Sequence, residues 1–279
     1  MTLRVPALLA LAALGCAAGP EEPGLPPPDG GGFIPQPDAG AGPTCRGNRD
    51  GVIDRSEVAF VTGVTVRYRV NPAGTLARVA PAGEARSDGT RRWDFSDRAG
   101  ETVSVALLAA PQQWFAASFS QAQYAAPLDP RAPELGVYLA TDAAVQLLGV
   151  AGPNESDDTL VRYDAPLDVL RFPLSVGATW TAEATTQAGR IGGTPVASRD
   201  RYAISVDARG EVVLPELTFP DALRVRVELT QSFPAGPGRR RIQYLWMTEC
   251  YGEVARMVSQ DNEADPAFTL AAEFRRLGL

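Results

Sequence analysis

Apolar and polar side chains alternate along much of this chain. In the segments 64–70 and 223–229, valine, leucine or tyrosine occupies every second position, and threonine, arginine or glutamate stands between them. A period of two places the apolar side chains on one face of a β-strand, whereas a helix would need a period near 3.6. The pattern therefore predicts strands with one dry and one wet face. Further candidate strands are 102–109, 135–140, 145–150, 159–163, 179–185, 201–206, 211–214, 241–250, 253–260 and 268–276.

The spacing of these strands constrains the architecture of residues 62–279. Clusters of turn residues separate them, for example at 152–154, 207–210 and 234–238. No segment shows helical periodicity over more than two turns, and we find no internal repeat. We therefore predict a mainly β domain, a single antiparallel sandwich or a curved half-barrel with few short helices. Both faces of 242–247 carry large apolar groups, so we expect that strand to be central and covered on both sides.

Two short stretches resemble parts of other exported proteins. The stretch FPLSVGATW at 172–180 and the stretch FPDALRV at 219–225 look like pieces of uncharacterised β-rich modules of secreted bacterial proteins. The resemblance implies a long curved sheet. It carries no functional residues.

The chain begins with features of an exported protein. One arginine precedes an apolar run over 5–15, which is too short to span a bilayer and has the length of a signal-peptide core. The sequence ALGC at 13–16 resembles the lipobox of bacterial lipoproteins, although alanine stands first where that family prefers leucine. The resemblance implies a signal peptide over 1–15 and a lipid on Cys16 that anchors the protein to a membrane. An ordinary secretory signal is the alternative.

A Pro- and Gly-rich segment follows at 16–44 and contains almost no large apolar residues. Such a composition cannot bury enough surface to offset the entropy lost when a chain becomes ordered. We therefore predict a disordered tether, about 30 Å long as a random coil and about 80 Å long as polyproline II. A tether of that reach would hold the domain clear of the membrane surface.

The chain contains three cysteines. If Cys16 carries lipid, Cys45 and Cys250 remain as a pair in an oxidising compartment, and we expect them to form a disulfide. Two free thiols are the alternative, which an exported location disfavours. Closing so long a loop is worth roughly 4–5 kcal/mol in the chain-entropy model.

Two residue types that many enzymes use are missing. The sequence has no histidine, and all 26 basic residues are arginines. Ser-His and Cys-His pairs, imidazole zinc sites, Schiff bases and the phosphate-binding P-loop are therefore excluded. Two carboxylates could still support glycosidase chemistry, but turn positions explain candidates such as Asp94 and Asp97 as well. We expect no enzymatic activity, and the formal net charge of −7 disfavours nucleic acid as a partner.

The chain has four tryptophans, Trp93, Trp114, Trp180 and Trp246. They could line a sugar-binding platform or an apolar ligand pocket, or they could pack in the core. Trp180 and Trp246 stand on alternating strands beside other apolar residues. This setting favours packing.

The loop NRDGVIDRSE at 48–57 resembles the calcium loops of EF-hand and dockerin-like proteins. With Gly51 at the sixth position, oxygen donors fall at the ligand positions of those loops. The resemblance implies calcium as a cofactor of residues 45–61, with Ile53 packed inward. The implied ligands are Asn48, Asp50, the Val52 carbonyl, Asp54 and Glu57.

The loop departs from that motif at its first position, where Arg46 replaces an aspartate. Together with Arg49 and Arg55 it brings positive charge near the site, which weakens cation binding. Millimolar calcium outside the cell could still fill a weak site. The alternative is a structural turn at Asp50-Gly51, followed by a short helix that begins at 56–57.

Together these features predict a cell-envelope lipoprotein of structural or interaction type. Its lipid would hold it on the exported side of a membrane, at the periplasmic or surface face of an outer membrane, where it would contact an unidentified protein or small-ligand partner. The alternative is a carrier or receptor for a small apolar or carbohydrate ligand within a curved sheet. An enzyme ranks third.

Overall fold

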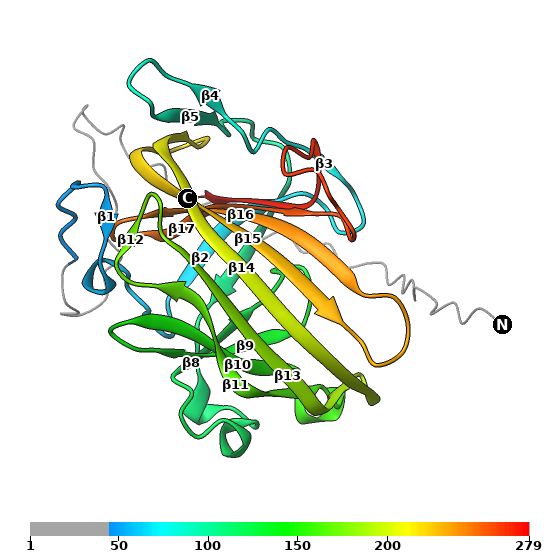
Figure 1. Cartoon of the computed structure of the whole chain (residues 1–279). Coiled ribbons are helices and arrows are strands. Elements are labelled where there is room, and N and C mark those ends of the chain that lie inside the picture. Colours follow the sequence, from blue (N-terminus) through cyan, green and yellow to red (C-terminus); the bar gives the residue numbers. More distant parts are fainter. Residues whose placement is uncertain (1–44, 279) are drawn as a thin grey trace, which may run out of the picture. The chain divides into compact units, whose positions relative to one another are not determined.

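The computed structural model describes residues 45–278, which belong to one compact unit, Pro43–Leu279. The predicted signal peptide, Cys16 and the tether lie outside the described residues. The described part is mainly β (Figure 1), which confirms the predicted fold class. The strands are β1 (Val52–Ile53), β2 (Thr65–Val70), β3 (Ala77–Arg78), β4 (Glu84–Ala85), β5 (Arg91–Asp94), β6 (Glu101–Ala106), β7 (Leu108–Ala109), β8 (Tyr124–Pro127), β9 (Leu135–Ala140), β10 (Ala144–Ala151), β11 (Leu160–Arg171), β12 (Leu174–Ser175), β13 (Thr179–Ile191), β14 (Thr194–Val213), β15 (Thr218–Ser232), β16 (Arg239–Thr248), β17 (Gly252–Ser259) and β18 (Leu270–Gly278).

The helical elements of residues 45–278 are four short 3₁₀ helices: η1 (Arg55–Glu57), η2 (Ala110–Gln112), η3 (Ala116–Ser118) and η4 (Glu155–Asp157). The prediction of few short helices is therefore confirmed. None of these helical elements has the length and hydropathy that a membrane-crossing helix requires.

Sixteen of the strands form one sheet. Its order is β6-β2-β18-β17-β16-β15-β14-β13-β11-β10-β9-β8-β7, and neighbours along this path are antiparallel. From β13 to β18 the strands follow the chain order, up and down. Within the described residues β5 makes the one parallel pair, with the end of β14. β1 and β12 form a separate two-stranded ladder.

One predicted turn is wrong. The predicted strands 201–206 and 211–214 both belong to β14, which runs on between them. Two register shifts against β15 carry the chain through this region without reversing it, so the polar cluster marks bulges and not a turn. Gly210 lies where β5 crosses close to β14, and a Cβ there would collide with the carbonyl oxygen of Arg91.

The sheet curls until its two edges meet. Its first strand, β6, ends at Ala106, and its last strand, β7, begins at Leu108, so a single residue joins opposite edges of the sheet. Across the interior, Tyr124 of β8 packs in the same core cluster as Leu245 of β16. Figure 1 shows β8–β11 and β16–β18 on opposite sides of this curl, with β13–β15 between them. The architecture is thus the curved one of the two predicted arrangements.

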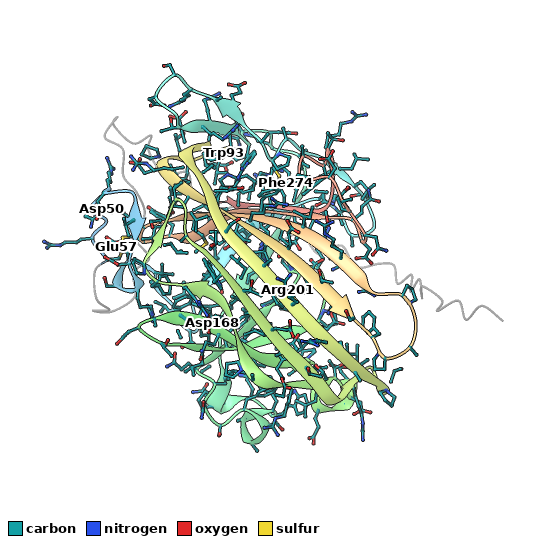
Figure 2. All side chains as sticks on the ribbon, in the orientation of Figure 1. Asp50, Glu57, Trp93, Asp168, Arg201 and Phe274 are labelled. Atoms are coloured by element: carbon teal, nitrogen blue, oxygen red, sulfur yellow. A yellow bond between two sulfur atoms is a disulfide. The ribbon has the colours of Figure 1, made fainter. Side chains whose placement is uncertain are left out.

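Alternation along β16 gives the sheet two packed faces. Leu245 and Met247 point into the curl. Trp246 points outward and meets Trp93 edge to face, with ring centroids 5.7 Å apart. Phe274 of β18 belongs to the same outer cluster as Trp93, and the two lie on the same side of the sheet (Figure 2). The prediction of a central strand that is covered on both sides is confirmed.

Three of the four tryptophans are core residues. Trp93, Trp180 and Trp246 are buried, as the packing interpretation predicts. Trp114 is half-buried, and its indole nitrogen donates to the Gly152 carbonyl oxygen at 2.9 Å. The tryptophans therefore do not form one exposed platform.

Candidate functional site

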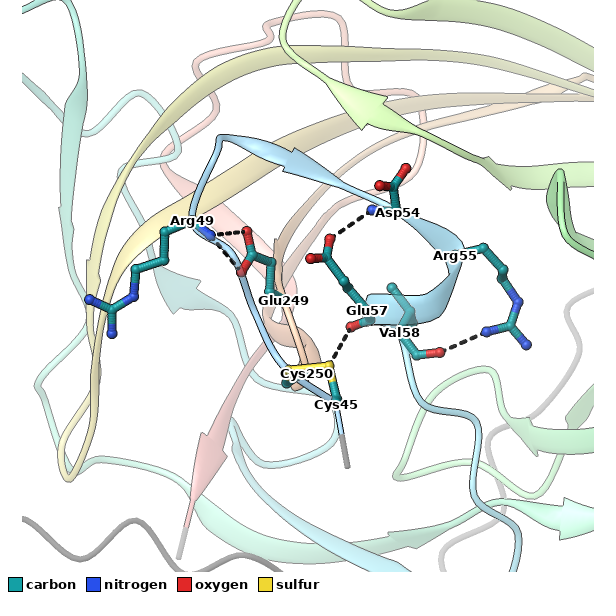
Figure 3. The surroundings of a disulfide bond; sticks show 8 residues. All are labelled: Cys45, Arg49, Asp54, Arg55, Glu57, Val58, Glu249 and Cys250. Atoms are coloured by element: carbon teal, nitrogen blue, oxygen red, sulfur yellow. Dashed lines mark hydrogen bonds between the residues drawn. A yellow bond between two sulfur atoms is a disulfide. The ribbon is translucent and has the colours of Figure 1, made fainter. Parts of the chain in front are cut away.

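The predicted disulfide forms between Cys45 and Cys250, with their Cα atoms 5.4 Å apart (Figure 3). Cys250 lies in the short turn between β16 and β17, so the bond joins the first described residue to the middle of the sheet. The Cys250 N–H also donates to the Glu57 carbonyl oxygen at 2.6 Å. The entry segment 45–61 is thus fixed to the domain by a covalent bond and a main-chain hydrogen bond.

The calcium-like loop wraps around an acid that sequence reasoning missed. The carboxylate of Glu249, next to Cys250, accepts the Arg49 N–H at 3.0 and 3.1 Å (Figure 3). At Gly47 the loop passes so close that a Cβ would collide with this carboxylate. Gly51 has φ +85°, a left-handed conformation that glycine adopts without strain. The predicted disulfide was the one available signal, since it brings the neighbours of Cys250 to this loop.

Two of the implied ligands hydrogen-bond each other. The Asn48 side-chain amide donates to Asp50 Oδ2 at 3.0 Å, and the Asp50 N–H donates to Asn48 Oδ1 at 2.9 Å. Asp50 Oδ1 in turn accepts the Val52 N–H at 2.8 Å. Asn48 and Asp50 are exposed, whereas Val52 is half-buried in its ladder with Ser175. These contacts build the turn that the structural alternative predicts.

Of the other two implied side-chain ligands, Asp54 is the N-cap residue of the short helix η1 and Glu57 is the last residue of that helix. The Asp54 N–H donates to Glu57 Oε2 at 3.0 Å, so the Glu57 carboxylate closes the first turn of this helix. Glu57 is buried, and Asp54 is exposed. Ile53 is 1% exposed and packs in the core with Leu174. The prediction that Ile53 packs inward is confirmed.

The five implied calcium ligands do not converge in this conformation. Among residues 45–278 no three Asp, Glu, Cys or His side chains lie close enough together to hold a metal ion. The Glu57 carboxylate, which would close the coordination shell, is bound to the Asp54 N–H. Calcium binding to these residues stays a prediction.

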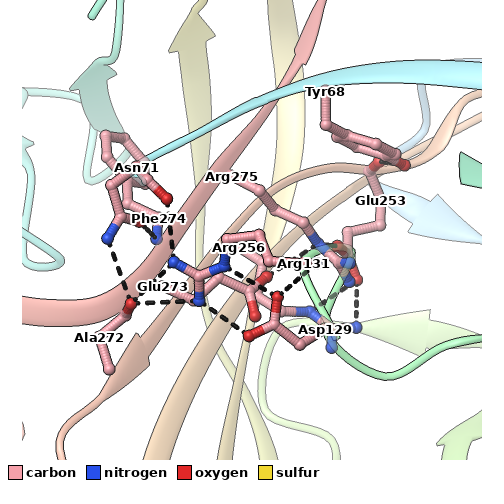
Figure 4. Close-up of polar contacts among 10 residues, drawn as sticks. All are labelled: Tyr68, Asn71, Asp129, Arg131, Glu253, Arg256, Ala272, Glu273, Phe274 and Arg275. Carbon is pink, nitrogen blue, oxygen red and sulfur yellow. Dashed lines mark hydrogen bonds and ion pairs between the residues drawn. The ribbon is translucent and has the colours of Figure 1, made fainter. Parts of the chain in front are cut away.

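A second polar site lies inside the curl, on β17 and β18 (Figure 4). Glu253 and Arg256 point inward although they are three residues apart, because a bulge opposite Trp246 shifts the alternation of β17. Glu273 and Arg275 of β18 point into the same space. We call these four residues the ionic cluster. Side-chain exposure in it ranges from 5% at Glu273 to 20% at Arg256.

Glu253 holds two arginines that face each other. Arg256 and Arg275 are direct cross-strand partners, a position in which like charges repel. Glu253 Oε1 accepts from Arg275 Nε at 2.7 Å, and Glu253 Oε2 accepts from Arg256 Nε at 3.0 Å. The Tyr68 hydroxyl donates to the Glu253 carbonyl oxygen at 3.2 Å. One carboxylate therefore pairs with both cations, of which Arg275 is buried and Arg256 half-buried. Glu273 adds a longer contact to Arg275, at 3.4 Å.

Burial acts on the two acids of the cluster with different outcomes. At Glu253 burial would raise the pKa, but the charges and hydrogen bonds of Arg256 and Arg275 outweigh it and lower the pKa. At Glu273 burial raises the pKa, because Arg275 lies at 3.4 Å and compensates only in part. Glu273 Oε1 is buried and accepts no hydrogen bond within the described residues. Burial, with the charge of Glu253, also raises the pKa of Tyr68 to about 12.

A further buried acid lies in the same interior. Asp200 of β14 is 1% exposed, and its Oδ2 accepts from the Tyr163 hydroxyl at 2.8 Å and from Gln231 Nε2 at 3.0 Å. Its Oδ1 is buried without a hydrogen-bond partner in residues 45–278. Burial raises the pKa of Tyr163, and the neighbouring Tyr202 and Asp200 add to the shift.

The acids considered for glycosidase chemistry occupy turns. The Asp94 carboxylate accepts the Ser96 N–H at 3.1 Å, and the Asp97 carboxylate accepts the Ala99 N–H at 2.8 Å. Hydrogen bonds from Ser96 lower the pKa of Asp94, with Arg92 adding to the shift. This bonding matches the turn interpretation.

Comparison of the chain with protein-family models, with curated proteins and with solved structures found no match. The function therefore has to be inferred from the sequence signals and from the geometry of these two sites.

Proposed function

We propose that the protein is a cell-envelope lipoprotein of structural or interaction type, anchored through Cys16 on the exported side of a membrane. The observation that carries this proposal is the disulfide between Cys45 and Cys250. Disulfides persist in oxidising compartments outside the cytosol. The bond also ties Cys45, the residue that follows the predicted tether, to the turn between β16 and β17, so that a pull on the predicted tether would be transmitted to the sheet.

The residue inventory supports a role without catalysis. Histidine and lysine are missing from the whole sequence, which removes the common proton-transfer and nucleophilic groups. A structural or interaction protein needs neither. The partner would be a protein or a small ligand at the same membrane.

The anchor is tested by labelling cells that produce the full chain with radioactive palmitate. We expect label in the wild-type protein and none in Cys16→Ser, which should also leave the membrane fraction. Ala17→Ser is the matched control and should keep both the label and the membrane location. A wild-type chain that stays unlabelled, or that keeps residues 1–15, would contradict the proposal.

The alternative function, a carrier inside the curved sheet, requires interior space. The interior is occupied by the apolar cluster around Leu245 and by the ionic cluster. Two hollows among the described residues, one beside Thr181 and one beside Phe172, are open depressions at the surface. These observations favour the interaction role over the carrier.

We propose weak calcium binding as a property of the loop 48–57. Its inward Ile53 and its left-handed Gly51 support this proposal, since both belong to the EF-hand pattern. With ~10 mM calcium and a Kd of ~1 mM, the domain would gain about 1.4 kcal/mol, a rise in Tm of about 3–5 °C. Glu57→Gln should abolish the rise. A Tm that is equal in calcium and in chelator would contradict calcium binding by the loop.

A further inference from the structure

The curl of the sheet leaves a seam between β6 and β8. The two strands lie side by side, but within residues 45–278 no backbone ladder pairs them. β6 pairs with β2, and β8 pairs with β7 and β9. At Leu107 the chain itself joins the two edges. Away from Leu107, the outer edge of β6 has no strand partner in the described residues.

The segment 128–134, between β8 and β9, bridges this seam. From it, the Arg131 guanidinium donates to the carbonyl oxygen of Asn71 at 2.9 Å and, through two nitrogens, to that of Ala272 at 3.2 Å (Figure 4). Asn71 follows β2 and Ala272 belongs to β18, so both acceptors lie on the far side of the seam. Asp129 holds the same guanidinium from the near side, at 2.9 and 2.8 Å.

A single side chain, that of Arg131, holds this segment on the rest of the described domain by hydrogen bonds. The other hydrogen bonds of residues 128–134 stay inside the segment: the Leu128 N–H donates to the Glu134 carbonyl oxygen, and the N–H groups of Arg131 and Ala132 donate to oxygens of Asp129. Within residues 45–278, Arg131 alone forms hydrogen bonds from the segment to the rest of the chain. Every residue of the segment is half-buried or exposed. Loss of one side chain would therefore release it.

The segment lies next to the ionic cluster. Figure 4 shows Asp129 and Arg131 beside Glu273 and Arg275, and the Glu273 carboxylate adds to the negative field at Arg131. Glu273 is 4% exposed, and its buried Oε1 accepts no hydrogen bond within the described residues, with Arg275 Nε at 3.4 Å. The guanidinium thus lies among two carbonyl oxygens and the Asp129 carboxylate, a set of acceptors that matches its planar donors.

We propose that residues 128–134 form a latch that opens the seam while the rest of the sheet stays folded. The carbonyl oxygens of Asn71 and Ala272, with Glu273 as a neighbour, form a cradle that binds one guanidinium group. In the closed state Arg131 fills it. In the open state the cradle is free for a guanidinium group of another molecule, such as an arginine side chain of a protein partner.

Hydrogen exchange of the full chain tests the latch. Arg131→Lys keeps the positive charge but loses the planar fork, and we expect amide exchange over 126–136 to rise about ten- to a hundredfold. Exchange in β15 and β16 should stay unchanged. The matched control is Arg190→Lys, whose guanidinium pairs with Asp158 at an exposed turn, and it should leave 126–136 unchanged. No rise over 126–136, or an equal rise in β15 and β16, would overturn the latch.

A second variant tests the cradle. In Arg131→Ala the latch should be open, and millimolar methylguanidinium should slow the exchange of 126–136 back toward the wild-type rate by bridging Asp129 and the two carbonyl oxygens. Methylammonium at the same concentration, which lacks the planar donor set, should have no such effect. Equal effects of the two ions, or no effect of methylguanidinium, would overturn the assignment of a guanidinium site.

Discussion

β16 and β17 are neighbours in the sheet, but their inward faces are chemical opposites. Met247 and Leu245 of β16 stand directly opposite Glu253 and Arg256 of β17. Apolar burial stabilises a protein in proportion to area and requires no particular partner. Buried charges stabilise only while each has its counterion, because a charge that loses its partner costs several kcal/mol. Equivalent substitutions on the two strands should therefore differ in size and in pH dependence.

The largest effect is expected at Glu253. Glu253→Gln keeps the shape but leaves Arg256 without a counterion and Arg275 with only the longer contact to Glu273 at 3.4 Å. The facing cations should then lower the free energy of unfolding by roughly 3–5 kcal/mol at neutral pH. Urea unfolding measures the change. Glu183→Gln is the matched control: its partner Arg199 is exposed, and the loss should be about 0–1 kcal/mol. Equal losses of stability in Glu253→Gln and Glu183→Gln would show that the buried pairs of Glu253 contribute no more than an exposed pair.

The difference in stability between the wild type and Glu253→Gln should also depend on pH. The folded pKa of Glu253 is lowered below its ordinary 4.5, so its contribution is complete above pH 4.5 and is lost as the pH falls through the folded pKa. The difference between wild type and variant should shrink below pH 4.5. A difference that stays constant down to pH 3 would show that Glu253 has the same pKa in the folded and unfolded states, and would contradict the lowered pKa.

A smaller loss of stability is expected for a substitution on the apolar inward face of β16. Met247→Ala removes a side chain that is 3% exposed, and the lost burial and the cavity should cost about 2–3 kcal/mol. Met247 carries no charge, so this cost should be the same at pH 4 and pH 7. Thermal and urea unfolding at both pH values measure it. A cost that changes with pH would place Met247 inside the ionic cluster.

Glu273→Gln should raise the free energy of unfolding by about 1 kcal/mol at pH 7, because it removes a buried charge that is poorly compensated. The folded pKa of Glu273 is raised above its ordinary 4.5, so its protonated form favours the native state and stability falls as the pH rises through this range. The gain should therefore be present at pH 7 and vanish below pH 4.5. Urea unfolding of wild type and variant at pH 7 and below pH 4.5 measures this difference. A variant that is less stable than the wild type at pH 7 would contradict the prediction.

The smallest effect is expected at Tyr68. Tyr68→Phe removes a long hydrogen bond to the Glu253 carbonyl oxygen, which should cost about 0.5 kcal/mol. Alkaline titration followed by ultraviolet absorbance should lose a tyrosine that ionises at about 12. If the variant lost a tyrosine that ionises near 10, Tyr68 would be accessible to solvent.

Much of the fold could be predicted from the sequence, because alternation reports directly on strands with one buried face. The segments 64–70 and 223–229 lie in β2 and β15 with shifts of a residue or a few. The disulfide followed from the number of cysteines and their expected compartment. The turn at 207–210 was wrong because Gly and Asp mark a bulge as readily as a reversal.

The ionic cluster could not be predicted, for a physical reason. Glu273 and Arg275 alternate with other residues as on a wet face, whereas Glu253 and Arg256 are three residues apart and share a face only through a bulge that the sequence does not show. Alternation shows that a face is polar, but it does not show whether that face meets water or the opposite wall of a curled sheet. The contacts of Glu249 and Arg131 span 200 and 141 residues, and no local pattern encodes such distances.

The central claim is that the curled sheet buries a stabilising ion pair, Glu253 with Arg275, beside an apolar core. A double-mutant cycle between Glu253 and Arg275, with Glu253→Gln, Arg275→Met and the double variant, tests it most directly by urea unfolding at pH 7. We predict a coupling free energy of about 2 kcal/mol or more. A coupling below about 0.5 kcal/mol, the range of exposed pairs, would show that these charges are solvated and that the interior is not closed around them.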